Sequence, residues 1–177
     1  MTHHYSNVFA LLPPYYELIK DMFVSAVAGE RADELLQAIT EGNTEFFTEL
    51  LQSFILNSMS SYDLSSNEPE KSYHLFVLGL LVVLSSSYEI KSNRESGLGR
   101  YDIMLIPKDI QQTGIVIEFK KVIQGETPKS AAQKALNQII NKKYMQELES
   151  RGVRKIICYG IAFEGKLISI KSMNYSK

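Results

Sequence analysis

Apolar residues in the first sixty positions recur at the three- and four-residue spacing of amphipathic helices. The pattern predicts one helix over residues 15–28, a second over 32–39 and a third over 46–55. Asn43 or Thr44 can cap the third helix, because both side chains accept hydrogen bonds from free backbone amides at a helix start. The N-terminal third is therefore expected to be helical.

A segment rich in Ser, Asp and Asn follows these helices, over residues 58–69, and it predicts a loop. We place the main boundary of the chain here. Residues 1–69 are expected to form an α-helical extension that packs on the core, and residues 70–177 to form the core domain.

After this loop the pattern changes to short β-branched runs between two helical stretches. The expected elements are a strongly apolar helix buried on most sides (71–84), strands (88–92, 101–106 and 115–120), a helix opened by Pro128 and stopped by Gly152 (128–149), and two strands (154–163 and 167–170). The turn residues 107–114 predict antiparallel pairing of the second and third strands. The expected fold is α/β, with a mixed central sheet flanked by helices.

Two carboxylates and one amine fall on the paired strands. Alternate residues of a strand share a face, so Glu118 and Lys120 point the same way, and Asp102 on the preceding strand can lie beside them. Such groups are costly among Ile, Val and Leu unless something compensates their charge. A divalent metal is one compensation, because Mg²⁺ prefers one or two carboxylates together with water and phosphate oxygens. A structural salt bridge between Glu118 and Lys120 is the alternative.

The long helix of residues 128–149 contributes further polar candidates. Ala131, Ala135, Gln138 and Lys142 share one face, and two alanines allow this face to approach the sheet closely. Gln138 and Lys142 are therefore expected near the carboxylates. The alternative for Gln138 is that it caps a neighbouring carbonyl.

Composition excludes several classes of protein. The chain has 177 residues, 45% hydrophobic and 22% charged, and a single cysteine, so it can form neither an intrachain disulfide nor a cysteine-rich zinc site. Its longest apolar run, residues 76–84, is too short to cross a bilayer, and the N-terminus lacks the pattern of a secretory signal. We expect a cytoplasmic protein without a membrane partner.

The charge is distributed unevenly between the two halves. Residues 1–90 carry three basic and twelve acidic side chains, a net charge of −9, whereas residues 91–177 carry sixteen basic and eight acidic ones, a net charge of +8. The sum is the overall −1. Such asymmetry suggests that the second half meets a polyanion, although the two halves can also neutralise each other within one fold.

These motifs together resemble the PD-(D/E)XK nuclease superfamily, whose core runs helix, three strands, helix, strand. The resemblance rests on Asp102 in GRYD and on Glu118 and Lys120 in IEFK. Over residues 70–171 the strings SNRESGLGRYDIML, IVIEFK and ALNQIINKKY are similar to the nuclease-like C-terminal domain of AAA-ATPase-like proteins. Tyr101 stands where the family name has proline, and the chain contains no P-loop motif.

The resemblance implies a restriction-endonuclease-like core and roles for the three residues. Asp102 and Glu118 would bind Mg²⁺ or Mn²⁺ with the carbonyl of Phe119 as a further ligand. Lys120 would orient or deprotonate the attacking water. Many members also carry a glutamate on the first core helix, and Glu70 or His74 could take that place here. A histidine facing an apolar interior is more often a core residue.

Supporting residues follow from the same resemblance. Gln138 and Tyr144 correspond to a glutamine and a tyrosine often found in this region, although Tyr144 could also pack on the surface. The glycine-marked segment of residues 92–100 is expected to be a polar link into the Asp102 strand. Candidate contacts to nucleic acid are Arg94, Arg100, Lys121 and Lys142, with pairing to Glu95 as the alternative for Arg100 and a solvated helix face as the alternative for the lysines.

The expected activity is therefore metal-dependent hydrolysis of phosphodiester bonds in nucleic acid, with DNA as the expected substrate. A homodimer is compatible with this activity because cutting both strands needs two sites. Because the ATPase module is missing, we expect either a stand-alone version or an excised domain, with a separate ATPase among the candidate partners. The alternative is a catalytically inactive module of the same fold that binds nucleic acid or a protein.

Overall fold

The computed structural model describes residues 30–58 and 69–176 of the chain. The expected helix over residues 15–28 and nearly all of the expected loop lie outside these ranges. The elements, in chain order, are α2 (Glu30–Glu41), α3 (Thr44–Ser58), α5 (Pro69–Leu81), the 3₁₀ turn η2 (Val82–Ser86), β1 (Tyr88–Ser96), β2 (Gly99–Pro107), β3 (Gly114–Lys121), α6 (Pro128–Asn141), α7 (Gln146–Ser150), β4 (Lys155–Glu164) and β5 (Leu167–Ser176).

The five strands form one mixed sheet in the order β1-β2-β3-β4-β5. β3 and β4 pair in parallel, and every other neighbouring pair is antiparallel. The parallel pair requires a crossover, and α6 supplies it, with Thr127 capping the helix by accepting a hydrogen bond from the amide of Ser130. The predicted α/β fold and its order of helix, three strands, helix and two strands are confirmed.

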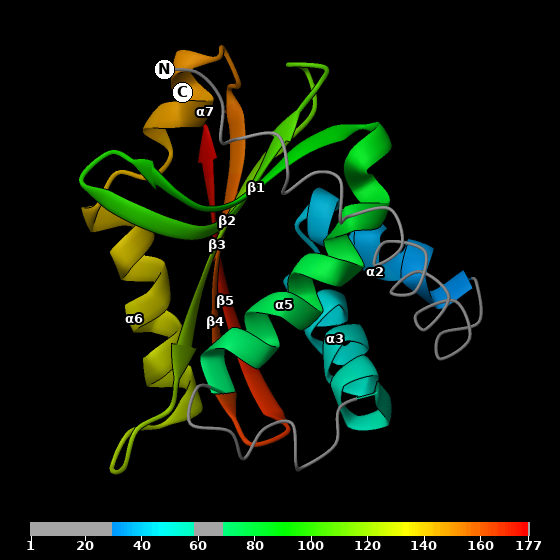
Figure 1. Ribbon diagram of the computed structural model, residues 1–177, viewed down its shortest axis with the longest axis vertical. Helices are drawn as coiled ribbons and strands as arrows, with labels where there is room; N and C mark the ends of the chain where they lie inside the picture. The colour runs from blue at the N-terminus through cyan, green and yellow to red at the C-terminus, as the bar shows by residue number, and fades with distance from the viewer. Residues whose placement is uncertain (1–29, 59–68, 177) are drawn as a thin grey trace, which may run out of the picture.

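Helices cover both faces of the sheet (Figure 1). One face packs against α2, α3 and α5 in a large apolar cluster that includes Ile117 and Phe119 of β3. The other face packs against α6 and the segment after it in a second cluster that includes Met104 and Val116. The strands of the centre are therefore buried on both sides, which explains their long apolar runs.

The N-terminal helices bind directly to the sheet. The hydroxyl of Tyr159 in β4 donates to the carbonyl of Ile39 at 2.8 Å, and the side chain of Gln52 in α3 bonds the backbone of Lys166 and Ile168 at 2.6 and 2.9 Å. Through these bonds α2 and α3 contact the strands and the turn between β4 and β5. The domain boundary at residue 69 stays a prediction.

Two predicted helices differ from those observed. α5 ends at Leu81, three residues before the predicted end, and it is buried on most sides, since only Lys71 and Leu75 are exposed among its described side chains. The helix expected over residues 128–149 stops at Asn141, and α7 begins only at Gln146. The interruption has a backbone cause, since Lys143 takes a left-handed conformation with φ of 56°, which no α-helix tolerates.

Two predicted strands are longer than expected. β1 continues to Ser96 and β5 to Ser176. The segment of residues 92–100 is therefore no link but the end of a β-hairpin, closed by a turn at Gly97 with φ of 59°. The polar residues of this segment predicted a link and not strands. The two strands extend here beyond the part of β2 that pairs with β3, so they do not need apolar faces. Within the described ranges no helix has the length and apolar character to cross a membrane, and the cytoplasmic location stays a prediction.

Gly160 sets the distance between α6 and the sheet, and we expect Gly160→Ala to be destabilising. A Cβ at this position would lie 2.2 Å from the carbonyl oxygen of Ala132 and 2.4 Å from the amide of Leu136, both backbone atoms of α6. Overpacking of this kind costs about 1–3 kcal/mol of unfolding free energy. Urea unfolding measures the loss. Gly165→Ala is the control: Gly165 has a left-handed backbone conformation and open space around it, so this change adds backbone strain without crowding.

Candidate functional site

Asp102 lies on β2, at a position where the pairing between β1 and β2 is interrupted. Asn93 is the residue opposite it, between the paired residues Ser92↔Ile103 and Arg94↔Tyr101, and Asn93 takes a φ of 53°. The carboxylate of Asp102 turns toward β3, where Oδ2 accepts a hydrogen bond of 2.8 Å from the amide of Phe119. This bond ties the aspartate to the strand that carries the second carboxylate.

Glu118 is the only charged or polar residue among the buried residues of the described chain, with 3% of its surface exposed. Its Oε1 accepts hydrogen bonds from Nζ of Lys120 at 3.1 Å and from the side-chain amide of Gln138. Its Oε2 is buried and finds no partner within the described residues. An unsatisfied buried carboxylate oxygen is unusual and indicates a ligand site.

The charge of Glu118 is held in an unfavourable environment. Burial, the larger cause, and the nearby negative charge of Asp102 together raise the pKa of this carboxyl from 4.5 to about 7. Lys120 opposes the shift through its charge and its hydrogen bond. Desolvation together with a like charge is the combination found at functional sites.

Lys120 connects the buried carboxylate with solvent. Its side chain is 34% exposed while its amine is 3.1 Å from Glu118. The expected salt bridge between the two therefore exists, and Asp102 adds a second negative charge beside it. The amine is accessible to a substrate at the surface.

Gln138 and Tyr144 form a polar support behind Glu118. Gln138 projects from α6, and its side-chain nitrogen donates both to Glu118 and, at 3.2 Å, to the hydroxyl of Tyr144. The side-chain nitrogen of Gln138 therefore binds the carboxylate of Glu118 and does not cap a backbone carbonyl. Tyr144 does not lie on the surface, because only 1% of it is exposed.

His74 reaches the site from the opposite face of the sheet. Its Nε2 lies 3.3 Å from the carbonyl oxygen of Asp102 and 2.9 Å from the hydroxyl of Ser92, and its ring contacts the edge of Phe119. It thus holds the backbone of Asp102. Glu70 is the second residue of α5, and its side chain is not among those that the structure describes.

The four candidate nucleic-acid contacts all have exposed side chains. Arg94 and Arg100 belong to the β1–β2 hairpin, Lys121 ends β3, and Lys142 follows α6. The side chain of Lys142 lies beside Gly99 of the hairpin, and its expected position near the carboxylates stays a prediction. Gln138 is the helix residue that the structure brings to Glu118.

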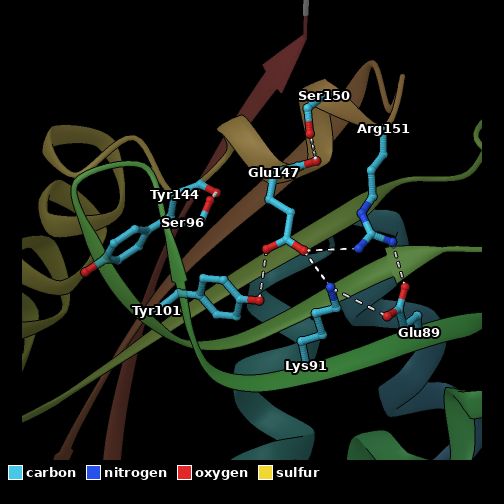
Figure 2. Close-up of polar contacts among 8 residues, drawn as sticks. All are labelled: Glu89, Lys91, Ser96, Tyr101, Tyr144, Glu147, Ser150 and Arg151. Carbon is cyan, nitrogen blue, oxygen red and sulfur yellow. Dashed lines mark hydrogen bonds and ion pairs between the residues drawn. The ribbon is translucent and has the colours of Figure 1, made fainter.

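A second polar cluster was not predicted from the sequence (Figure 2). Glu147 of α7 binds Lys91 at 2.7 Å and accepts a hydrogen bond from the hydroxyl of Tyr101 at 3.2 Å. Arg151 bridges Glu147 and Glu89 at 3.3 and 2.7 Å. These contacts fix the hairpin to α7, and only the alternation of Glu89 and Lys91 on one strand face could have suggested them.

The residues present fit a divalent cation. Asp102 and Glu118 supply oxygen atoms, and the partnerless Oε2 of Glu118 is a suitable ligand atom. Among the described residues no group of three His, Cys, Asp or Glu side chains gathers to hold a metal. A site with two carboxylates suits Mg²⁺, which keeps water and substrate phosphate as its other ligands.

Comparison with known proteins agrees with this geometry. No curated protein matches the chain. A family model described as the PD-(D/E)XK nuclease superfamily matches residues 68–173, which is more than half of the chain and contains both carboxylates, Lys120 and Gln138. The chain therefore belongs to the PD-(D/E)XK nuclease superfamily.

Proposed function

We propose that this protein is a metal-dependent nuclease that hydrolyses phosphodiester bonds in DNA. Membership of the superfamily suggests a nuclease and a nucleic-acid substrate. The observation that carries the proposal is the buried Oε2 of Glu118, without a partner in the described chain and next to Asp102. A purely structural ion pair would not require a second carboxylate and a free buried oxygen.

The residues that would hold Mg²⁺ or Mn²⁺ are Asp102, Glu118 and the carbonyl of Phe119. The cation, when bound, would lower the pKa of a water molecule and offset negative charge on the phosphoryl oxygens. Asp102 is held in place by its bond to the amide of Phe119, and His74 holds its carbonyl. The two carboxylates are thus positioned before any ligand arrives.

Lys120 would orient the attacking water and place positive charge beside the scissile phosphate. Its amine is anchored on Glu118 and accessible from the surface. Gln138, supported by Tyr144, keeps the carboxylate of Glu118 in one orientation. The flanking phosphates would be bound by four exposed basic residues, Arg94, Arg100, Lys121 and Lys142. Contacts of this kind position the DNA but do not distinguish one base sequence from another.

Two further parts of the proposal concern partners: the resemblance of residues 70–171 to the nuclease-like C-terminal domain of AAA-ATPase-like proteins suggests an ATPase, and the cutting of both strands suggests a second copy of the chain. An ATPase would act together with this nuclease. A homodimer would supply the second site needed to cut both strands of a duplex. Size-exclusion chromatography with light scattering measures the oligomeric state.

Cleavage that depends on a divalent metal is the direct test. Purified protein incubated with linear, nicked and branched DNA should produce fragments with Mg²⁺ or Mn²⁺ and none with EDTA. A parallel preparation of Asp102→Ala controls for contaminating nucleases. Metal-dependent cleavage by both preparations, or by neither, would contradict the proposal.

A catalytically inactive nucleic-acid-binding or protein-binding module is the second candidate. It is favoured by one observation, that no three-ligand group gathers within the described residues. Binding to DNA measured against salt concentration separates the two candidates. A steep salt dependence without turnover supports a DNA-binding module, and no DNA binding at all supports a protein partner.

A further inference from the structure

The turn of the β1–β2 hairpin presents an apolar side chain to solvent. Leu98 is 67% exposed, more than any other large apolar residue in the described part of the chain. The hairpin bends away from the sheet and its turn lies beyond the C-terminal end of α6, at the left of Figure 1. A single exposed leucine is ordinary on a protein surface, so the surroundings of the turn decide its meaning.

The turn is rigidly held. The amide of Leu98 donates to the carbonyl of Lys142 at 2.7 Å, and the hydroxyl of Ser96 donates to the carbonyl of Tyr144 at 2.8 Å. Gly97 is packed so closely that a Cβ would lie 2.2 Å from the carbonyl oxygen of Lys142. The contacts of Ser96, Gly97 and Leu98 therefore hold the backbone of the turn in place while the side chain of Leu98 is exposed to solvent.

The turn is also coupled to the candidate site. Tyr144, which receives the bond from Ser96, is the residue whose hydroxyl contacts Gln138, and Gln138 binds Glu118. Figure 2 shows Ser96 and Tyr144 in contact beside Tyr101, which α7 holds through Glu147. Leu98 thus keeps a constant position relative to the carboxylates.

Several basic residues lie on the hairpin and on the segment that holds its turn. Arg94 and Arg100 lie on the two strands of the hairpin and Lys142 and Lys143 on the segment beneath it, all exposed. Glu95 is the one acidic residue on this part of the hairpin, opposite Arg100 in the pairing. An apolar tip within such a group of cations suits a ligand that combines a phosphate backbone with flat apolar faces, which describes nucleic acid.

On the basis of the proposed function, we propose that Leu98 is a wedge that enters between two bases of the bound DNA, so that the protein prefers DNA with an easily opened step, such as a nick. Apolar side chains of this kind unstack base steps in other DNA-binding proteins. Leu98 precedes Asp102 by four residues, about 13 Å of extended chain. This separation corresponds to about four nucleotides from the phosphate at the site.

Binding without cleavage tests the wedge. The protein is titrated in EDTA with intact duplex and with nicked duplex carrying 2-aminopurine at the nick, a base whose fluorescence rises when it is unstacked. Wild-type protein should bind the nicked DNA about tenfold more tightly, because a nicked step costs less to open. Leu98→Ala should reduce this preference to less than twofold and remove the fluorescence rise, and Leu98→Met should retain both.

Controls separate this proposal from others. Leu167→Ala removes a leucine that is 58% exposed at the start of β5 and should behave as wild type. Circular dichroism melting shows whether each variant is folded. An unchanged preference in folded Leu98→Ala, or no binding of either DNA by wild-type protein, would overturn the wedge. Because EDTA prevents cleavage, an inactive protein that still shows the preference would refute only the nuclease proposal.

Discussion

Replacing Lys120 by alanine should lower the rate of DNA cleavage by about 100- to 1,000-fold, the usual effect of removing one electrostatic donor from an active site. The amine is the only cation with a hydrogen bond to Glu118 in the described chain, and its partial exposure makes it accessible to a phosphate. The variant also leaves Glu118 without its main positive neighbour. The loss should therefore appear at saturating DNA and not in the affinity alone.

Single-turnover cleavage with excess protein measures this effect, since it separates chemistry from binding. Lys171→Ala is the matched control, because Lys171 is an exposed lysine on the edge strand β5. Lys120→Arg keeps the charge but not the shape of the amine and should recover only part of the rate. A loss of less than about tenfold in Lys120→Ala would exclude a catalytic role for this residue.

The central strands could be predicted from the sequence because burial on both faces leaves a strong apolar signal. β2, β3 and β4 follow it closely, and the antiparallel pairing of β2 with β3 follows from the short turn between them. The proximity of Asp102 and Glu118 depends on that pairing alone. Simple alternation on strands was therefore sufficient to place the two carboxylates near each other.

The periphery of the site could not be predicted in the same way. The break between α6 and α7 depends on the left-handed conformation of Lys143, and lysine carries no sequence signal for it. That break directs Tyr144 inward and gives α7 its contacts with the hairpin. The support of Gln138 by Tyr144 and the position of Leu98 both result from backbone geometry that residue patterns do not encode.

Replacing Glu118 by glutamine should stabilise the metal-free protein at pH 8 by about 3 kcal/mol while it abolishes metal binding. The pKa of this carboxyl is about 7 in the folded chain against an ordinary value of 4.5. Between these values the folded state holds a proton that the unfolded state has released. Stability must therefore fall as pH rises through this window and is lowest above pH 7.

Urea unfolding in EDTA between pH 4 and pH 8.5 measures the difference between the two proteins. Wild type and Glu118→Gln should be similar near pH 4 and diverge steadily toward pH 7.5, because glutamine has no charge to bury. Glu164→Gln, which changes an exposed carboxylate at the end of β4, should show no such divergence.

Added Mg²⁺ should then reverse the order of stability. A ligand that binds only the folded state stabilises it by mass action, and wild-type protein alone would retain both carboxylates for the cation. Without metal, the Glu118→Gln variant would thus be more stable than wild type, and added Mg²⁺ would not stabilise it further. The reason is that the same buried charge destabilises the fold and binds the cation. A constant difference between the two proteins across pH, or equal stabilisation of both by Mg²⁺, would show that Glu118 is a structural residue and not a metal ligand.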